Sequence, residues 1–164
     1  MIDVCLVGNP NTGKTTLYNT LTGSHEHVGN WHGVTVEEKA VKYSFAGQDI
    51  RLVDLPGIYS LTPLSFEEKV SADYLVAHPD NIVVNICDAS NLQRNLYLTL
   101  CLLERGCKVI LVVNQIDKRP ICKLDFVKLS EMLGVNVVYV NAGDKTSAAK
   151  VNEQILQASK SDIK

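Results

Sequence analysis

The sequence lacks several features that would assign it to other protein classes. No segment approaches the roughly 20 apolar residues that cross a membrane, and the N-terminus shows no signal peptide. Basic residues are not in excess, since 16 Lys and Arg stand against 18 Asp and Glu. The net charge of −2 gives no electrostatic case for binding nucleic acid across the surface. We find no internal repeat, low-complexity tract or domain linker, and therefore expect one soluble domain over residues 1–164.

The cysteines also lack the spacing of a metal site or a redox motif. The five are Cys5, Cys87, Cys101, Cys107 and Cys122, and none belongs to a CxxC pair. Cys5, Cys87 and Cys107 lie in or beside apolar runs. This scatter is typical of reduced, mostly buried thiols in a cytosolic protein. We therefore expect neither disulfides nor a zinc site.

What is present begins with residues 8–15, Gly-Asn-Pro-Asn-Thr-Gly-Lys-Thr, which match the phosphate-binding P-loop G-x-x-x-x-G-K-[ST]. An apolar, strand-like run over 2–7 precedes the loop, and a helix is expected over 16–21. Backbone N–H groups of such a loop point at phosphate oxygens. Lys14 can reach the β- and γ-phosphates, and the Thr15 hydroxyl can bind Mg²⁺. The predicted nucleotide-binding residues here are Asn9, Asn11, Thr12, Gly13, Lys14, Thr15 and Thr16.

The rest of the chain alternates between strands and helices. A Gly-rich, polar stretch over 23–35 is predicted to be a loop, followed by an antiparallel hairpin of strands 36–45 and 50–54. Helices are expected over 66–76, 92–105, 123–133 and 148–158, and strands over 81–87, 108–114 and 135–140. In the helix at 92–105, Leu96, Leu100 and Leu103 are spaced to share a face. This order predicts an α/β, doubly wound, mainly parallel six-stranded sheet with one antiparallel edge strand.

Ligands of such sheets bind at the carboxyl ends of the strands, and three strand ends carry suitable residues. Asp54 ends one strand and suits the binding of Mg²⁺ through water, while the N–H of Gly57 can reach a γ-phosphate. Asp117 can accept two hydrogen bonds from guanine, and adenine offers neither donor. A backbone N–H after the last strand can reach guanine O6. The predicted base-side residues are Asn114, Gln115, Asp117, Asn141, Ala142 and Gly143.

The order of these motifs resembles the small GTPase superfamily and therefore a Ras-like P-loop GTPase fold. Three blocks, GNPNTGKTTLYN, VGNWHGVTVE and DLPGIYSL, resemble the cytosolic G domain of bacterial ferrous iron transporter B. The resemblance implies that residues 29–35 form switch I, where Gly33 and Thr35 contact nucleotide and Thr35 joins Mg²⁺. It also implies that Gly57 opens switch II and that Asn11 coordinates K⁺. Lys14, Thr35, Gly57 and Asn11 are then the expected catalytic residues.

By the same resemblance, the chain would bind GTP and GDP and hydrolyse GTP slowly, with Mg²⁺ and, as a further candidate, K⁺. It would lie at the cytoplasmic face of the bacterial inner membrane, as the regulatory domain of a longer ferrous iron transporter. Its expected partners are guanine nucleotide, the transmembrane region of that protein, and one or two further copies through the switch regions, with no nucleic acid. The family's helical and transmembrane domains are absent from this sequence.

Four departures from the family pattern qualify these expectations. His32 replaces a common Pro, Gln115 a common Lys or Met, and Asn141-Ala142 the usual Ser-Ala, which bears on guanine affinity and release. Ile58 stands where Ras has its water-positioning Gln, and an apolar side chain cannot orient water. We therefore expect turnover near that of unassisted Ras, roughly 10⁻⁴ to 10⁻³ s⁻¹. An Era-type ribosome-associated GTPase, a non-catalytic nucleotide-sensing module and an ATPase remain as alternatives.

Overall fold

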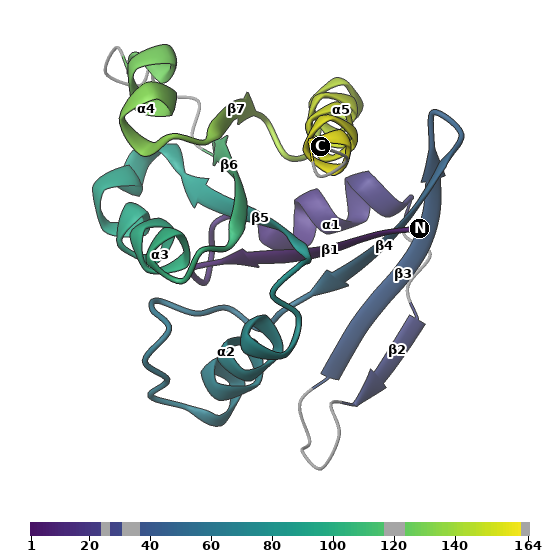
Figure 1. Cartoon of the computed structure of the whole chain (residues 1–164), viewed down its shortest axis with the longest axis horizontal. Coiled ribbons are helices and arrows are strands. Elements are labelled where there is room, and N and C mark those ends of the chain that lie inside the picture. The colour runs from purple at the N-terminus through teal and green to yellow at the C-terminus, as the bar shows by residue number, and fades with distance from the viewer. Residues whose placement is uncertain (24–26, 31–36, 117–123, 162–164) are drawn as a thin grey trace.

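A sheet of seven strands runs through the centre of the part of the chain that the structure describes. The computed structural model describes residues 1–23, 27–30, 37–116 and 124–161, with the backbone alone for 27–30, 37 and 38. The strands are β1 (Ile2–Gly8), β2 (His27–Asn30), β3 (Glu37–Phe45), β4 (Gln48–Asp54), β5 (Ile82–Asp88), β6 (Lys108–Asn114) and β7 (Asn136–Val140). Their order is β2-β3-β4-β1-β5-β6-β7 (Figure 1). Strand β1 is central and parallel to β4 and β5. Its carboxyl end therefore lies between the carboxyl ends of these two neighbours.

The doubly wound, mainly parallel class is confirmed, but the predicted number of strands is wrong. Part of the predicted loop at 23–35 is the short strand β2, which pairs antiparallel with β3. The hairpin strand expected at the sheet edge is therefore internal, and the antiparallel part of the sheet contains two strands. A polar, Gly-containing segment such as His27–Asn30 gives no strand pattern, because an edge strand is stabilised by its backbone ladder rather than by buried side chains.

Within these described ranges, five α-helices cover the two faces of the sheet. They are α1 (Lys14–Thr22), α2 (Phe66–Ala77), α3 (Leu92–Glu104), α4 (Phe126–Leu133) and α5 (Lys145–Lys160), with a short 3₁₀ turn at Ala89–Asn91. Helix α4 begins later than predicted because Asp125 caps it, accepting from the amide of Lys128. Helix α5 begins earlier because Asp144 accepts from the amide of Thr146. None of the helices described is long and apolar enough to span a membrane.

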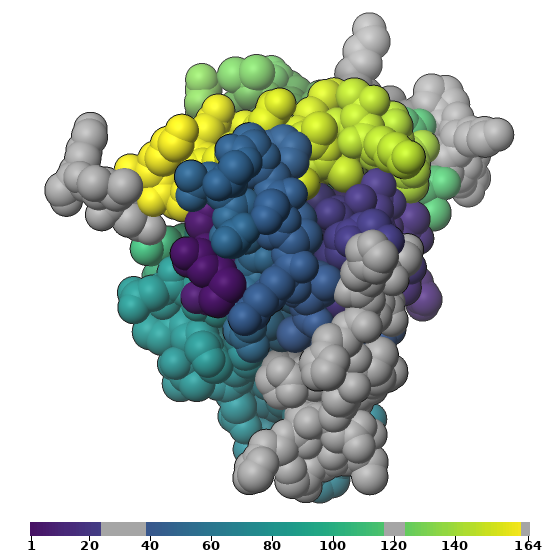
Figure 2. Space-filling view, turned by 90° about the vertical axis from the view of Figure 1, so that its right-hand side faces the viewer, coloured from purple at the N-terminus to yellow at the C-terminus, as the bar shows by residue number. Residues whose placement is uncertain are grey.

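Alternating side chains of β1 divide the core into two layers. Val4 and Leu6 pack with α1 and α5, whereas Cys5 and Val7 face the side that α2 and α3 cover (Figure 1). Helix α5 also borders the β3–β4 hairpin (Figure 2), where the Tyr43 hydroxyl donates to Asn152 Oδ1 at 2.7 Å. Both layers meet at β1, so the strand that leads into the P-loop is fixed on both sides.

The buried face of α3 includes two polar residues. Its buried residues are Leu92, Asn95, Leu98, Thr99 and Leu102, whereas Leu100 is 51% exposed. Asn95 and Thr99 are polar and are buried on this face because they bond to β5. Asn95 Oδ1 accepts from the amide of Asp88, and the Thr99 hydroxyl donates to Asn85. Of the three leucines spaced to share a face, Leu96 and Leu103 are partly buried and pack against the core, and only Leu100 is exposed.

Candidate functional site

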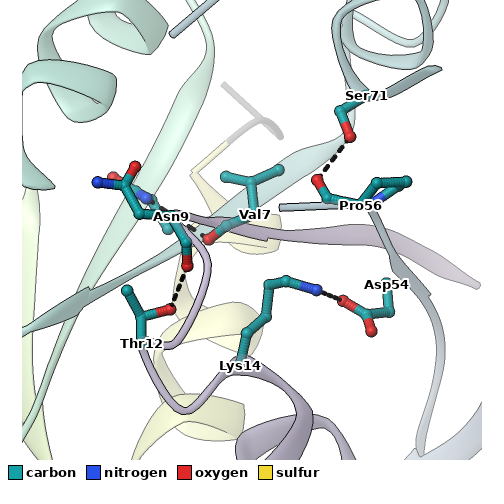
Figure 3. Close-up of polar contacts among 8 residues, drawn as sticks. Val7, Asn9, Thr12, Lys14, Asp54, Pro56 and Ser71 are labelled. Carbon is teal, nitrogen blue, oxygen red and sulfur yellow. Dashed lines mark hydrogen bonds and ion pairs between the residues drawn. The ribbon is translucent and has the colours of Figure 1, made fainter. Parts of the chain in front are cut away.

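The P-loop connects β1 to α1 through two residues with left-handed backbone. Asn11 has φ 62° and Gly13 has φ 86°, which is the conformation that glycine adopts without strain. The hydroxyl of Thr12 donates to the carbonyl of Asn9 at 2.9 Å and closes the turn (Figure 3). Helix α1 begins at Lys14 with no side-chain cap on its first amides. The loop therefore presents a helix N-terminus, which favours an anion.

Lys14 and Asp54 form an ion pair beside this loop. The ammonium of Lys14 donates to Asp54 Oδ1, and the side chains are only 12% and 7% exposed (Figure 3). Strand β4 lies next to β1, with Asp54 in register with Leu6, which is why the carboxylate reaches the P-loop lysine. The two groups predicted to serve phosphate and Mg²⁺ are thus brought together from positions 40 residues apart.

The segment after Asp54 runs directly behind the P-loop. The amide of Leu55 donates to Leu6 O at 3.1 Å, and the amide of Ile58 donates to Gly8 O at 3.0 Å. A β-carbon at Gly57 would lie 3.1 Å from Pro10 Cγ, so only glycine fits there without displacing the loop. The hydroxyl of Ser71 donates to Pro56 O at 2.7 Å and attaches the segment to α2 (Figure 3).

The side chain of Ile58 is fully buried and belongs to the core beneath α2 and α3. It packs in the same cluster as Val7 and Leu98, on the side of β1 that those helices cover. Residue 58 therefore anchors the segment that Gly57 opens, and its side chain is not available to a ligand.

Asn114, at the end of β6, joins the P-loop to the loop after β7. Its Nδ2 donates to Thr12 O at 3.0 Å, and its Oδ1 accepts from the amide of Ala142 at 2.9 Å. The carbonyl of Ala142 in turn accepts from Thr20 of α1 at 2.8 Å. Asn114 is 3% exposed, so both of its polar contacts are made within the fold. This bridge sets the spacing between the predicted phosphate and base regions.

Neighbouring base-side residues are held by shorter-range contacts. The amide of Gln115 donates to Val140 O at 2.8 Å, and its Oε1 accepts from the hydroxyl of Tyr139. The amide of Asn141 donates to Ser147 Oγ at 3.1 Å, while that of Gly143 makes only a 3.4 Å contact with Asn141 Oδ1. Gly143 is exposed.

The predicted site residues divide into three groups by location. Asn11, Thr15 and Thr16 are exposed, whereas Asn9, Thr12 and Asp54 are buried in the loop or behind it. Gly33, Thr35 and Asp117 lie outside the described residues, so the predictions for switch I and for the guanine carboxylate stay predictions. The other predicted residues lie at or after the carboxyl ends of β1, β4, β6 and β7.

Sequence reasoning missed a buried polar contact behind the loop. Asn85 is fully buried in β5, accepts from the Thr99 hydroxyl at 2.5 Å and makes a long 3.5 Å contact to Val7 O. An asparagine within an otherwise apolar strand was the available signal. Asp88, at the end of the same strand, caps the following 3₁₀ turn, since its Oδ1 accepts from the amide of Ser90 at 2.9 Å.

The described cysteines are free, and two of them are buried in this region. Burial raises the pKa of Cys87 to about 12 from the ordinary 9.0 and raises the pKa of Cys5 further. Both thiols therefore stay protonated at neutral pH. This agrees with the prediction of reduced cysteines for these positions, and Cys122 lies outside the described residues.

Comparison with known proteins extends these observations to a family. A family model described as ferrous iron transport protein B matches residues 2–155. The Fe(2+) transporter FeoB of Escherichia coli K12 is 45% identical over 143 residues, which cover 84% of this chain and 18% of that protein. The chain therefore spans less than a fifth of the curated relatives it matches.

Solved structures agree with this assignment. The G domain of the T. maritima FeoB iron transporter is 40% identical, with a TM-score of 0.87 and coverage of 97% of this chain and 99% of that one. An S. thermophilus NFeoB mutant bound to GDP is 42% identical, with a TM-score of 0.86 over 96% of this chain and 62% of that one. The chain belongs to the ferrous iron transport protein B family and has the fold of its G domain.

Proposed function

We propose that this chain binds GTP and GDP, hydrolyses GTP slowly, and serves as the regulatory G domain of a ferrous iron transporter. The observation that carries the proposal is the meeting of Lys14, Asp54 and the Gly57 segment beside a P-loop that opens onto a helix N-terminus. A cation, a carboxylate and convergent amides are what a nucleotide with bound metal requires. The GDP complex of the S. thermophilus relative supports this choice of ligand.

Guanine selection is assigned to the ends of β6 and β7. Asp117 would accept the two guanine donors, and Gly143 or Ala142 would offer an amide to O6. Asn114 bonds to Thr12 and Ala142 through one donor and one acceptor of its amide, which leaves a second N–H for the base. It would also hold the P-loop and the base loops at a fixed spacing. Adenine would leave the carboxylate of Asp117 without a donor, which is costly in a desolvated site.

The donor set fits Mg²⁺. Asp54 provides a carboxylate with 7% exposure, and Thr15 at the start of α1 is exposed and provides a hydroxyl. Oxygen ligands of this kind suit a hard divalent cation that keeps several of its waters. Asp54 would hold the ion through water, Thr15 would ligate it directly, and Thr35 would join them in the GTP state.

A monovalent cation site would form at Asn11. Asn11 is exposed and has a left-handed φ of 62°. An amide oxygen is a suitable ligand for K⁺. When bound, Mg²⁺ and K⁺ would supply positive charge to the phosphates, which is the function of an arginine finger in other GTPases.

The reaction would be in-line attack of water on the γ-phosphate. Lys14 would leave Asp54 for the β- and γ-phosphates, and the Gly57 N–H would bind a γ-phosphate oxygen. Ile58 would take no part, since its side chain is buried in the core. Water would therefore be oriented by backbone groups or by a partner. After hydrolysis, loss of the γ-phosphate would release Thr35 and Gly57 and relax both switches.

The buried Ile58 also favours a second candidate function, a nucleotide sensor that regulates transport by binding alone. Single-turnover release of phosphate from bound GTP separates the two functions. A sensor would hold GTP unchanged for hours, whereas a slow GTPase would convert it at roughly 10⁻⁴ to 10⁻³ s⁻¹.

The context of the whole protein is part of the proposal. The domain would work at the cytoplasmic face of the inner membrane, with the transmembrane region of the full-length transporter as its partner. Two or three copies would associate through the switch regions. The 45% identity to an Fe(2+) transporter supports this context over the Era-type alternative.

The proposal is tested by phosphate release from GTP in KCl and in NaCl at equal ionic strength. We expect slow hydrolysis that K⁺ stimulates, with Asn11→Ala abolishing the stimulation and leaving GDP affinity within about threefold. Equal rates in the two salts would remove K⁺ from the mechanism. Failure of the chain to bind GDP in the presence of Mg²⁺ would contradict the proposal as a whole.

A further inference from the structure

Gln115 is held by a tyrosine on the neighbouring strand. The Tyr139 hydroxyl donates to Gln115 Oε1, 24 residues earlier in the chain. Tyr139 lies on the edge strand β7 and is 36% exposed. The backbone of Gln115 is also fixed, because its amide donates to Val140 O at 2.8 Å. Both the backbone and the side chain of this base-side residue are thus tied to β7.

The direction of this hydrogen bond decides what Gln115 can offer a ligand. An amide side chain accepts at oxygen and donates at nitrogen. Tyr139 uses the oxygen, so the NH₂ group is the end that remains to donate to an oxygen of a bound nucleoside. Without the tyrosine hydroxyl, the amide could rotate and present either end. Tyr139 therefore fixes both the position and the polarity of the Gln115 side chain.

Tyr139 is itself supported by a second aromatic ring. Phe126, the first residue of α4, packs against it with ring centroids 5.0 Å apart and an interplanar angle of 36°. Tilted pairs at this separation are favourable. The ring of Tyr139 also lies on the sheet face that Phe126 and Leu129 partly cover. Phe126 therefore restricts, from one side, the orientation of the ring that carries the hydroxyl.

The position of Gln115 links this arrangement to the rest of the site. It follows Asn114, which bonds to Thr12 O of the P-loop and to the Ala142 amide. A side chain attached to so fixed a backbone loses little further entropy when it binds a ligand, which favours slow dissociation.

We propose that Tyr139 is a positioning residue for the nucleotide site, and that its hydroxyl, with Phe126 behind it, holds the Gln115 amide and slows release of guanine nucleotide. This inference rests on the proposed function, since it concerns the ligand of the same site. It assigns a regulatory effect to a residue on β7 that itself need not touch the nucleotide.

The test measures dissociation of a fluorescent GDP analogue carrying a methylanthraniloyl group, chased with excess GDP. Tyr139→Phe removes the hydroxyl and keeps the ring that packs on Phe126. We expect about two- to tenfold faster release, which corresponds to the loss of one hydrogen bond. Tyr97→Phe, a change at a 62% exposed tyrosine of α3, is the matched control and should leave the rate unchanged.

Repeating the Tyr139→Phe comparison in a protein substituted at Gln115 separates positioning of Gln115 from a general structural effect. Leucine has neither a donor nor an acceptor in its side chain, so in Gln115→Leu the tyrosine hydroxyl has no partner at residue 115. There, adding Tyr139→Phe should change the release rate by less than about 1.5-fold. An equal acceleration in both backgrounds would overturn the inference, because it would show that Tyr139 acts independently of Gln115.

The outcomes also distinguish this inference from the proposed function. If the unsubstituted chain retains no labelled GDP, the proposed function fails and this inference fails with it. If the unsubstituted chain retains GDP and Tyr139→Phe releases it at the same rate, only the inference is overturned. Thermal unfolding of each variant, monitored by circular dichroism, verifies that the compared proteins are folded.

Discussion

The side-chain nitrogen of Asn114 occupies the space next to Gly13 where any larger residue would need to place its β-carbon. That carbon would lie 2.2 Å from Asn114 Nδ2, and Gly13 has a left-handed φ of 86°. The same nitrogen donates to Thr12 O, so the close approach and the hydrogen bond depend on each other. The glycine of the P-loop thus has a packing reason in addition to its conformational one.

Gly13→Ala is therefore expected to lower stability and GDP affinity much more than an alanine at another glycine with a left-handed backbone. We expect the free energy of unfolding to fall by about 2–4 kcal/mol, through backbone strain and displacement of Asn114, and GDP affinity to fall at least about tenfold. Gly47→Ala is the matched control, because Gly47 has φ 77° but its β-carbon would meet nothing within 4 Å. Gly47→Ala should lower the free energy of unfolding by about 1–2 kcal/mol and leave GDP affinity unchanged. Urea unfolding and nucleotide titration measure both effects.

Asn114→Ala tests the bridge between the P-loop and the loop after β7. It leaves Thr12 O and the Ala142 amide without their partner, and we expect a loss of about 2–4 kcal/mol in unfolding free energy, with GDP affinity reduced at least about tenfold. Asn152→Ala is the control, since Asn152 is 5% exposed and accepts from Tyr43 on the far side of α5. Its variant should lose stability and keep GDP affinity. Equal GDP affinities for the two variants would refute a role of the bridge in binding.

Ile58→Gln tests whether the Ras-like residue can be restored at this position. The amide would be buried in the core beneath α2 and α3, so we expect a loss of about 2–4 kcal/mol in unfolding free energy and no increase in GTP turnover. Tyr59→Gln, a change at a 43% exposed neighbour, should be nearly neutral for stability. A tenfold rise in single-turnover hydrolysis by Ile58→Gln would show that the side chain can reach the attacking water.

The raised pKa of Cys87 predicts a loss of stability in alkali. In the unfolded chain the thiol ionises near its ordinary pKa of 9.0, whereas burial in the folded protein raises the pKa to about 12. Between these values the unfolded state binds fewer protons, so stability falls with rising pH by about 1.4 kcal/mol per pH unit for this group. Below pH 9 the group contributes no slope. Cys87→Ala should flatten the dependence between pH 9 and 11 relative to Cys101→Ala, measured by urea unfolding.

The central parallel strands β1, β5 and β6 could be predicted because their residues are mostly apolar on both faces. The run over 82–88, for example, is buried at every position, and such runs are visible in sequence. The strand β2 could not be predicted, since its stability comes from pairing with β3 rather than from its own residues. The buried polar residues of α3 could not be predicted for a related reason: Asn95 and Thr99 are buried because they bond to groups of β5.

The residues of the site also divide into those that could be predicted from sequence and those that could not. Lys14 and Asp54 were predicted because their residue types and strand-end positions carry the chemistry, and the structure pairs them. The double contact of Asn114 and the hydroxyl of Tyr139 depend on distances between separate loops, which no local pattern encodes. The burial of Ile58 was likewise hidden, because the sequence shows that the residue is apolar but not which way it points.

The hydrogen bond from Ile58 N to Gly8 O limits how the neighbouring Gly57 can move. On one side of Gly57, the carbonyl of Pro56 is held by Ser71, and on the other, the amide of Ile58 is held by the P-loop strand. The Pro56 carbonyl shares a peptide plane with the Gly57 N–H, and the Ile58 N–H lies in the next plane, so rotation of either plane would break one of these bonds. The direction of the Gly57 N–H is thus fixed by bonds that it does not itself make, and any movement that follows the loss of a γ-phosphate would have to begin farther along the chain, beyond Ile58.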